Sequence, residues 1–268
     1  EDSLETMHSS VSIMRKALGP LHPRTAMALR DLARFYESKD SDTAIQVYEA
    51  AIETFRASPD HHAMVGSTLN NVAVLYIKCE NLDDAVEKLS DALAAYESGV
   101  ERGNALNPEV AQVWKNLGEC YTLRNEWESA LFAYTSALGV QEDARRCHDA
   151  LDSTSVDVSL DGPISFEGAD DSSYADTMLR LAKATASLGR YDEAVETYEE
   201  ALHIYRLMLH KSTIEADGHP STDMVEAQDR IAHTLYCIAE IQEKNVQYDE
   251  AIALFTEAFD LRLRSDAV

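Results

Sequence analysis

Basic residues are scarce in this sequence. It has 23 lysines and arginines against 48 aspartates and glutamates, which gives a formal net charge of −25. A surface of that sign repels phosphate backbones and anionic lipid headgroups, and no cluster of Lys and Arg offsets the repulsion. The sequence also lacks an apolar run of about 18 residues, the length that a membrane-spanning helix needs. We therefore expect no nucleic-acid partner and no membrane partner.

Cysteine, glycine and proline are also few. The four cysteines, Cys79, Cys120, Cys147 and Cys237, form no C-x-x-C pair, which favours reduced thiols over a disulfide framework or a zinc site. We therefore expect a cytoplasmic location. Ten glycines, six prolines and a hydrophobic fraction of 45% indicate a folded, mainly helical chain. Because the first residue is Glu and a helical pattern follows at once, we also expect a piece of a longer protein.

Sequence motifs for catalysis are absent as well. There is no Gly-rich phosphate loop, no G-x-S-x-G elbow, no H-E-x-x-H motif and no metal-ligand spacing of Cys and His. We therefore predict that the chain is not an enzyme and has no catalytic residue, metal site or cofactor.

What the sequence does contain is an internal repeat with three small residues at fixed spacing. The first small residue lies inside a predicted helix, at Ala33, Ala73, Gly118, Ala182 and Ala239. The second opens the next helix, at Ala44, Ala85, Ala130, Ala194 and Ala251. The third follows seven residues later, at Ala51, Ala92, Ala137, Ala201 and Ala258. Small residues among large apolar ones are typical of helices that cross closely, and such hairpins bury their apolar faces by stacking.

The third copy carries the clearest family resemblance. Residues 114–121 (WKNLGECY), followed by Ala130, Tyr134 and Ala137, resemble the tetratricopeptide repeat. The second-helix alanines Ala44 and Ala85 stand 41 residues apart, which exceeds the ordinary repeat of about 34 residues and is similar to the kinesin-light-chain type. The resemblance implies an all-α, right-handed superhelical solenoid of antiparallel helix pairs.

The spacing of the copies predicts the organisation of the chain. We expect one solenoid over residues 1–268, in which residues 1–19 are the second helix of a truncated repeat. Five repeats follow at 22–58, 62–98, 107–141, 174–210 and 220–264, the last with a longer first helix. Residues 142–173 are an acidic, Ser-rich insertion that we expect to form a mobile loop. This loop either has no role or folds residues 164–167 back into the groove as a built-in competitor.

The resemblance also implies which residues face a ligand, because first helices line a concave groove in this family. The candidate peptide-binding residues are Arg30, Arg34, Asn70, Asn71, Lys78, Lys115, Asn116, Leu179, Arg180, Lys183 and Tyr236. Their cations predict a locally positive groove that suits an acidic segment. Asn71 and Asn116 would hold the peptide backbone, while Leu179 and Tyr236 would form an apolar pocket. Alternatively, the cations balance neighbouring acids and the asparagines bond within the fold.

These observations predict a protein-interaction adaptor or scaffold that binds an acidic, partly apolar peptide in its groove, with cargo recognition for a motor as one version. Two alternatives stay open. The chain could be a structural subunit of a larger assembly that contacts partners through its repeat ends or convex face. It could also be a regulatory domain of a longer protein. Its state would be a monomer or a part of a larger complex.

Overall fold

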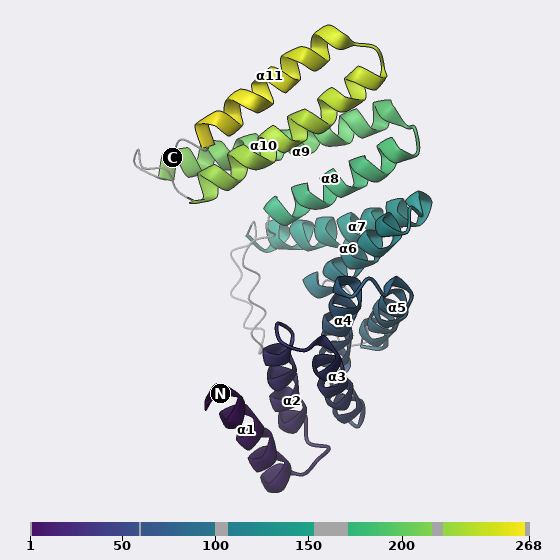
Figure 1. Ribbon diagram of the computed structural model, residues 1–268, viewed down its shortest axis with the longest axis vertical. Helices are drawn as coiled ribbons and strands as arrows, with labels where there is room; N and C mark the ends of the chain where they lie inside the picture. Colours follow the sequence, from purple (N-terminus) through teal and green to yellow (C-terminus); the bar gives the residue numbers. More distant parts are fainter. Residues whose placement is uncertain (1, 59, 100–106, 153–170, 216–221, 266–268) are drawn as a thin grey trace. The chain divides into compact units, whose positions relative to one another are not determined.

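The computed structural model describes residues 2–58, 60–99, 107–152, 171–215 and 222–265 (Figure 1). In these ranges the backbone forms α-helices and short connections, with no strand. The prediction of an all-α solenoid of helix pairs is therefore confirmed. The chain divides into two compact units, Glu1–Arg124 and Asn125–Val268, which we call unit 1 and unit 2.

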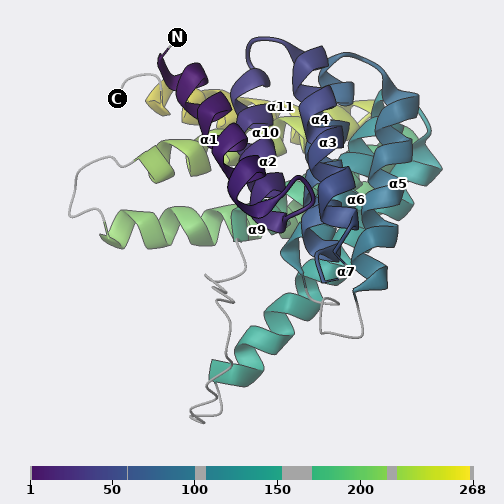
Figure 2. The same ribbon diagram turned by 90° about the horizontal axis from the view of Figure 1, so that it is seen from below.

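Unit 1 contains six of the described helices, each packed on its neighbour in the chain (Figures 1 and 2). They are α1 (Asp2–Leu18), α2 (Pro23–Tyr36), α3 (Ser41–Arg56), α4 (His62–Lys78), α5 (Leu82–Ser98) and α6 (Pro108–Leu123). The closest packing joins α2 to α3 and α4 to α5, which are the first and second helices of the predicted repeats. Both pairs are antiparallel hairpins.

Unit 2 contains the other described helices, again packed in chain order. They are α7 (Trp127–Asp152), α8 (Asp171–Ser187), α9 (Tyr191–Glu215), α10 (Thr222–Lys244) and α11 (Tyr248–Ser265). The hairpins α8/α9 and α10/α11 are joined by the packing of α9 on α10. The boundary between the units falls inside the predicted third repeat, between α6 and α7.

The helix starts follow from local sequence. The Asp40 side chain accepts a hydrogen bond from the backbone N–H of Thr43 and so caps α3. The Thr43 hydroxyl donates to the same carboxyl, and this bond first and the backbone bond second lower the pKa of Asp40. Asn107 caps α6 in the same way, with Pro108 in the first turn, where its missing N–H costs nothing.

Four of the turns between paired helices share one backbone feature, which the α2/α3 turn lacks. Glu80, Asn125, Gly189 and Val246 all have positive φ angles, of 60°, 58°, 78° and 65°. Each residue stands five positions before the small residue of the following second helix, at Ala85, Ala130, Ala194 and Ala251. A left-handed residue is the common way to end a helix, and glycine adopts it without strain. Val246 adopts it against the preference of a β-branched side chain.

The small residues of the repeat are buried as the pattern predicts. Ala33, Ala73, Ala85, Ala194 and Ala239 have no exposed surface. Gly66 makes a further close approach, because a Cβ atom at that position would lie 2.6 Å from the ring of Tyr96. These positions fix how closely the helices cross, since a larger side chain would have to move its neighbours.

The predicted loop at residues 142–173 is wrong at both ends. Residues 142–152 continue α7, and residues 171–173 form the start of α8. Arg146 pairs with Glu142 and Asp143 one turn earlier, an arrangement that supports a helix. Residues 164–167, the predicted competitor, lie outside the described residues.

Two further expectations concern thiols and membranes. All four cysteines are free thiols, with Cys79 and Cys147 exposed and Cys120 buried. Burial raises the pKa of the Cys120 thiol to about 11, so it stays protonated at neutral pH. Among the described helices, none has the length and apolar character that spanning a bilayer requires.

Candidate protein-interaction surfaces

Three first helices of unit 1 meet along one face. Arg30 on α2 places Nη1 3.3 Å from the sulfur of Met64 on α4. Asn116 on α6 donates from Nδ2 to Oδ1 of Asn70 on α4, at 2.7 Å. These contacts join α2 to α4 and α4 to α6 through three of the candidate residues, Arg30, Asn70 and Asn116. We call this face the first-helix surface, and it comprises Arg30, Arg34, Asn70, Asn71, Lys78, Lys115 and Asn116.

The asparagines of this surface bond within the fold. Asn116 is only 7% exposed, and its Oδ1 also accepts a hydrogen bond from Nε2 of Gln112 at 2.9 Å. The Asn116 oxygen and one of its amide hydrogens thus have partners within the fold, and its contact with a peptide backbone stays a prediction. Asn71 is half-buried and bonds to the Tyr48 hydroxyl, which donates to Glu37. Asn70 is half-buried beside Asn116.

The cations of the first-helix surface differ from other cations of unit 1. Arg34 and Lys78 are exposed and Arg30 is half-buried, and within the described ranges none of the three forms an ion pair. By contrast, Arg56 pairs with Asp91 and Arg124 pairs with Asp83. Lys115 is half-buried. Three cations thus stand without an ion pair on this face of a strongly acidic chain.

In unit 2 the candidate residues divide between core and surface. Leu179 is 8% exposed and packs in the core of α8, α9 and α10. The prediction that it lines an accessible pocket is therefore wrong. Arg180 and Lys183 on α8 are exposed. Tyr236 on α10 is 45% exposed, and its ring packs edge-on against Phe255 of α11 at 5.2 Å.

Lys183 lies close to two titratable side chains of α10. Its charge lowers the pKa of Cys237 and of His233, although burial has the largest effect on both groups. Burial raises the pKa of the Cys237 thiol, and the Tyr198 hydroxyl beside it lowers that pKa. The Sγ atom of Cys237 lies 3.9 Å from Nδ1 of His233, one helical turn away. This cluster contains no sequence motif for catalysis.

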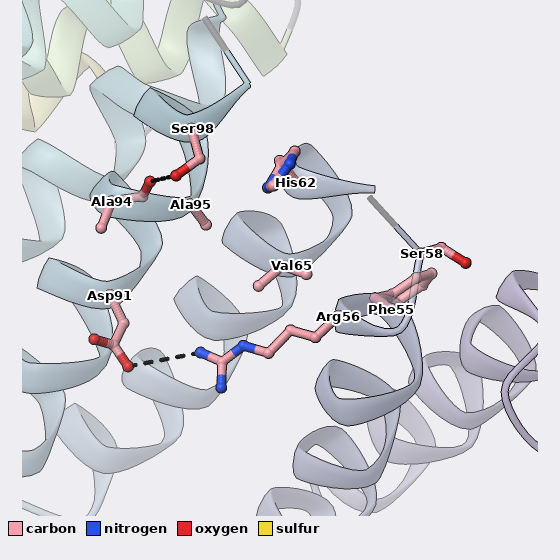
Figure 3. A pocket seen from close by; sticks show the side chains of 9 residues that line it. All are labelled: Phe55, Arg56, Ser58, His62, Val65, Asp91, Ala94, Ala95 and Ser98. Carbon is pink, nitrogen blue, oxygen red and sulfur yellow. Dashed lines mark hydrogen bonds and ion pairs between the residues drawn. The ribbon is translucent and has the colours of Figure 1, made fainter. Parts of the chain in front are cut away.

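Sequence reasoning missed two grooves between successive second helices. In unit 1, a groove of about 320 Å³ lies between α3 and α5, over α4. Its lining residues are Phe55, Arg56, Ser58, His62, Val65, Asp91, Ala94, Ala95 and Ser98. Figure 3 shows Arg56 extending past Val65 toward Asp91, with 3.9 Å between Nη2 and Oδ2. We call this the α3/α5 groove.

In unit 2, the corresponding groove lies between α9 and α11, over α10, and measures about 520 Å³. Its lining residues are Glu199, Leu202, His203, Arg206, Leu235, Ile238, Gln242, Glu250, Ala253, Leu254 and Glu257. An ion pair again joins the two walls, with 3.1 Å between Nη2 of Arg206 and Oε1 of Glu257. We call this the α9/α11 groove.

The two ion pairs occupy the same repeat positions. Arg56 and Arg206 each stand five residues after the third small residue of their repeat, Ala51 or Ala201. Asp91 and Glu257 each stand one residue before the third small residue of the next repeat. This coincidence is the sequence signal that could have located both grooves. No group of His, Cys, Asp and Glu in the described part of the chain is arranged to hold a metal ion.

Comparison with known families agrees with this architecture. A model of the tetratricopeptide repeat matches residues 1–57 and 64–143, and a second model of the same repeat matches residues 175–220. The chain belongs to the tetratricopeptide repeat (TPR) family. The first match alone covers half of the chain, and the two together include residues of both units.

Solved structures share the TPR fold at low identity. BtubC (BKLC) from P. vanneervenii is 16% identical with a TM-score of 0.68, covering 99% of this chain and 91% of that one. A putative kinesin light chain from Podosopora anserina is 16% identical with a TM-score of 0.58, covering 91% and 98%. MamA is 17% identical with a TM-score of 0.58, covering 92% and 96%. The resemblance to kinesin-light-chain repeats is thus confirmed at the level of fold.

Two curated relatives are similar to this TPR chain in sequence. The RxLR effector protein SFI4 of Phytophthora infestans is 24% identical over 209 residues, 76% of this chain and 53% of that protein. The secreted RxLR effector protein RXLR-C07 of Plasmopara halstedii is 24% identical over 207 residues, covering 76% and 56%. The chain therefore spans about half the length of the curated relatives it matches.

Proposed function

We propose that this TPR protein, a protein-interaction scaffold by its repeats, binds an acidic, partly apolar segment of a partner on the first-helix surface of unit 1. The observation that carries the proposal is the set of three cations there that form no ion pair. Arg30, Arg34 and Lys78 form no ion pair within the described ranges, although acidic residues outnumber basic ones two to one in the chain. Cations left without partners attract carboxylates and raise the rate of encounter with an acidic partner.

Two methionines supply apolar contacts beside these cations. Met64 touches Arg30 and is 37% exposed, and Met27 is 43% exposed one turn before Arg30 on α2. Methionine adapts its shape to irregular partners, so this pair fits the apolar part of a bound segment. In this proposal the two methionines supply the apolar contact that the sequence had assigned to Leu179. Lys115 borders the surface on α6, while Arg180, Lys183 and Tyr236 offer further contacts in unit 2.

The curated relatives suggest the setting in which such binding acts. Both are named RxLR effectors, and one is named a secreted protein. We therefore propose that this chain is the interaction module of an effector-type protein and performs no catalysis. The likeness to kinesin light chains supports the fold alone, so cargo recognition stays a prediction. The cytoplasmic location stays a prediction as well, and the free thiols suit a compartment that keeps thiols reduced.

The proposal is tested with a short fluorescein-labelled peptide of alternating Asp and Leu. Fluorescence anisotropy measures its affinity for the wild type and for the variant Arg30→Glu with Arg34→Glu. The control variant, Arg15→Glu with Lys16→Glu, makes the same charge change on the exposed face of α1. We expect the first-helix variant to lose at least about tenfold in affinity, because two favourable contacts become repulsive. Equal losses in both variants would mean that only overall charge matters and would refute the proposal.

A second candidate function is assembly through a repeat end, favoured by the outer face of α11. Tyr248, Ile252, Phe259 and Leu263 repeat at helical spacing there and are each more than half exposed. Exposed apolar stripes of this kind mark interaction surfaces. Light scattering across protein concentrations tests this candidate, with the variant Ile252→Glu and Phe259→Glu for comparison. Self-association that the variant abolishes supports assembly, and a constant monomer mass excludes assembly with a second copy.

A further inference from the structure

The α9/α11 groove has an apolar floor and two polar ends of different character. Leu202, Leu235 and Ile238 form the floor and are each less than 9% exposed. At one end, Arg206 and Glu257 neutralise each other across the groove. At the other end stand Glu199 and Glu250. This second end lies at the turn from α10 to α11, because the antiparallel packing brings the start of α9 to the end of α10.

The end with Glu199 and Glu250 carries acceptors that lack partners. In the described part of the structure, neither carboxylate forms an ion pair or a hydrogen bond. Gln242 lines the same end, and its buried Oε1 atom has no hydrogen-bond partner. A buried acceptor without a partner is rare in folded proteins and costs free energy, so a donor that enters the groove is favoured. The groove thus offers three acceptor groups, two carboxylates and one amide oxygen, over an apolar floor.

In unit 1, other side chains occupy the repeat positions that correspond to this end of the α9/α11 groove. Counting from the small residues of the repeat, Glu49 corresponds to Glu199, Asp84 to Glu250 and Tyr76 to Gln242. At the position of Leu254 in unit 2, unit 1 has Lys88. Burial first, and then Glu49 and Asp84, raise the pKa of Tyr76, while Lys88 lowers it, so these charged groups lie near the Tyr76 hydroxyl. The Nζ atom of Lys88 lies 3.6 Å from Oε1 of Glu87, and the Lys88 side chain is 23% exposed.

Unit 2 therefore keeps the two acids of this arrangement and lacks its cation and its ring. Leu254 carries no charge, and Gln242 is smaller than tyrosine and leaves space in the groove. In unit 1 the groove lies on the other side of the ion pair, toward Ser58 and Ser98, where Tyr76 and Lys88 do not reach the lining. At these positions unit 2 therefore lacks a basic group on an apolar stem. Lysine and arginine side chains have this form.

We propose that the α9/α11 groove is a docking site for a basic partner segment, which places a lysine or arginine side chain between Glu199 and Glu250 and its apolar neighbours on the groove floor. The cation donates to both carboxylates and to Oε1 of Gln242. Arg206 and Glu257 close the far end of the groove. This site differs from the first-helix surface in position and selects the opposite charge, so it stands independently of the proposed function.

The probe is a short fluorescein-labelled, leucine-containing peptide with one central lysine, and a matched peptide carries glutamate in its place. Anisotropy with the whole chain measures both affinities. We expect the lysine peptide to bind at least about fivefold more tightly than the glutamate peptide and to weaken as salt is added. We expect Glu199→Gln with Glu250→Gln to lower affinity for the lysine peptide by about fivefold or more. Equal affinity for the two peptides would overturn the proposal.

A matched control separates the groove from the general negative charge of the chain. Glu53→Gln with Asp192→Asn removes two exposed carboxylates from α3 and the start of α9, outside the groove lining. We expect this variant to bind the lysine peptide like the wild type. An equal loss in the control and in the groove variant would mean diffuse attraction and would overturn the docking site.

A second variant fills the groove from within and does not depend on removing charge. Gln242→Tyr with Leu254→Lys copies the arrangement of unit 1 into unit 2. We expect it to keep the circular dichroism spectrum of the wild type and to lose binding of the lysine peptide. A folded variant that binds the peptide as tightly as the wild type would overturn the proposal. Amide shifts on α9 and α11 in the wild type, seen by NMR with the lysine peptide, place the probe in the groove.

Discussion

The α3/α5 groove and the α9/α11 groove share one ion pair at equivalent repeat positions and open on opposite sides of it. Both have an arginine and an acid that join the two second helices. In unit 1, Tyr76 and Lys88 occupy the positions that Gln242 and Leu254 hold in unit 2. The small residues that set the helix crossings are shared, while a few positions beside them decide which part of the groove is open. In a repeat protein, packing and recognition are therefore carried by different residues.

The largest expected effect concerns the alanines at which the paired helices of each unit cross. We expect Ala85→Leu and Ala251→Leu each to lower the free energy of unfolding by about 1–3 kcal/mol, since both alanines lie where helices meet. The loss should be greater at Ala85. Its helix, α5, packs on both α4 and α6, whereas α11 packs on α10 among the described helices.

Urea unfolding followed by circular dichroism measures this difference. Ala94→Leu, at an exposed position of α5, is the control and should change stability little. A larger loss at Ala251 than at Ala85 would contradict the packing described for the two units.

The next effect concerns tyrosines at equivalent positions of the two units. The Tyr96 hydroxyl donates to Glu109 at 2.7 Å, and the Tyr205 hydroxyl donates to Asp176 at 2.5 Å. We expect Tyr96→Phe and Tyr205→Phe each to cost about 1 kcal/mol, the usual net value of one hydrogen bond. Tyr205→Phe should cost more, because Asp176 also pairs with Arg230 at 3.0 Å and the three groups form one network.

The same tyrosines predict a loss of stability in alkali. Burial first, and then the hydrogen-bonded carboxylate, raise the pKa of Tyr96 and Tyr205 above 10. Above pH 10 the unfolded chain therefore releases protons that the folded chain keeps, and the free energy of unfolding falls as pH rises. Absorbance of tyrosinate during alkaline titration checks this prediction. Ionisation of these two tyrosines without loss of helix would contradict it.

A smaller effect comes from making unit 1 resemble unit 2. Tyr76→Gln with Lys88→Leu opens in unit 1 the end of the groove that is open in unit 2. We expect a stability loss of about 1–2 kcal/mol from the removed half-buried ring. We also expect a second binding event with the lysine peptide, visible as a doubled stoichiometry in calorimetry. An unchanged stoichiometry would mean that these two positions do not distinguish the grooves.

The smallest effect is an acid sensitivity of unit 2. Burial, followed by Arg262 and Arg230, lowers the pKa of His233 below its ordinary value of 6.5, while Asp229 opposes them. As pH falls below 6.5, the unfolded chain binds a proton before the folded chain does, so unit 2 loses stability. We expect well under about 1.4 kcal/mol, the value of one pKa unit, because His233 is an exposed residue and solvent screens its charge.

Hydrogen exchange of α10 amides at several pH values measures this loss, and His233→Gln should remove it. Persistence of the pH dependence in that variant would assign it to another group.

The fold could be predicted from the sequence because the information is local. Each small residue, such as Ala73 or Ala194, belongs to a pattern within one hairpin, and its burial follows from that pattern. Residues 142–152 were misjudged because acidic composition suggested a loop, whereas Arg146 pairs with Glu142 one helical turn earlier and Arg145 pairs with Asp171 at the start of α8.

The candidate surface was predicted less well because its geometry depends on neighbours far along the chain. Asn116 bonds to Asn70, 46 residues away, and Leu179 packs among residues of α9 and α10. The two grooves were missed for the same reason, since each needs a pair of consecutive second helices. The repeat pattern of the family assigned the residues to the correct helices. It did not show which of their side chains already bond or pack within the fold.

The most direct test of the protein-interaction role is one binding experiment in which the acidic and basic peptides are measured against both charge variants. We predict that Arg30→Glu with Arg34→Glu lowers affinity for the acidic peptide alone. We predict that Glu199→Gln with Glu250→Gln lowers affinity for the lysine peptide alone. Loss of both peptides in either variant, or of neither peptide in both, would contradict two separate binding surfaces of opposite charge preference.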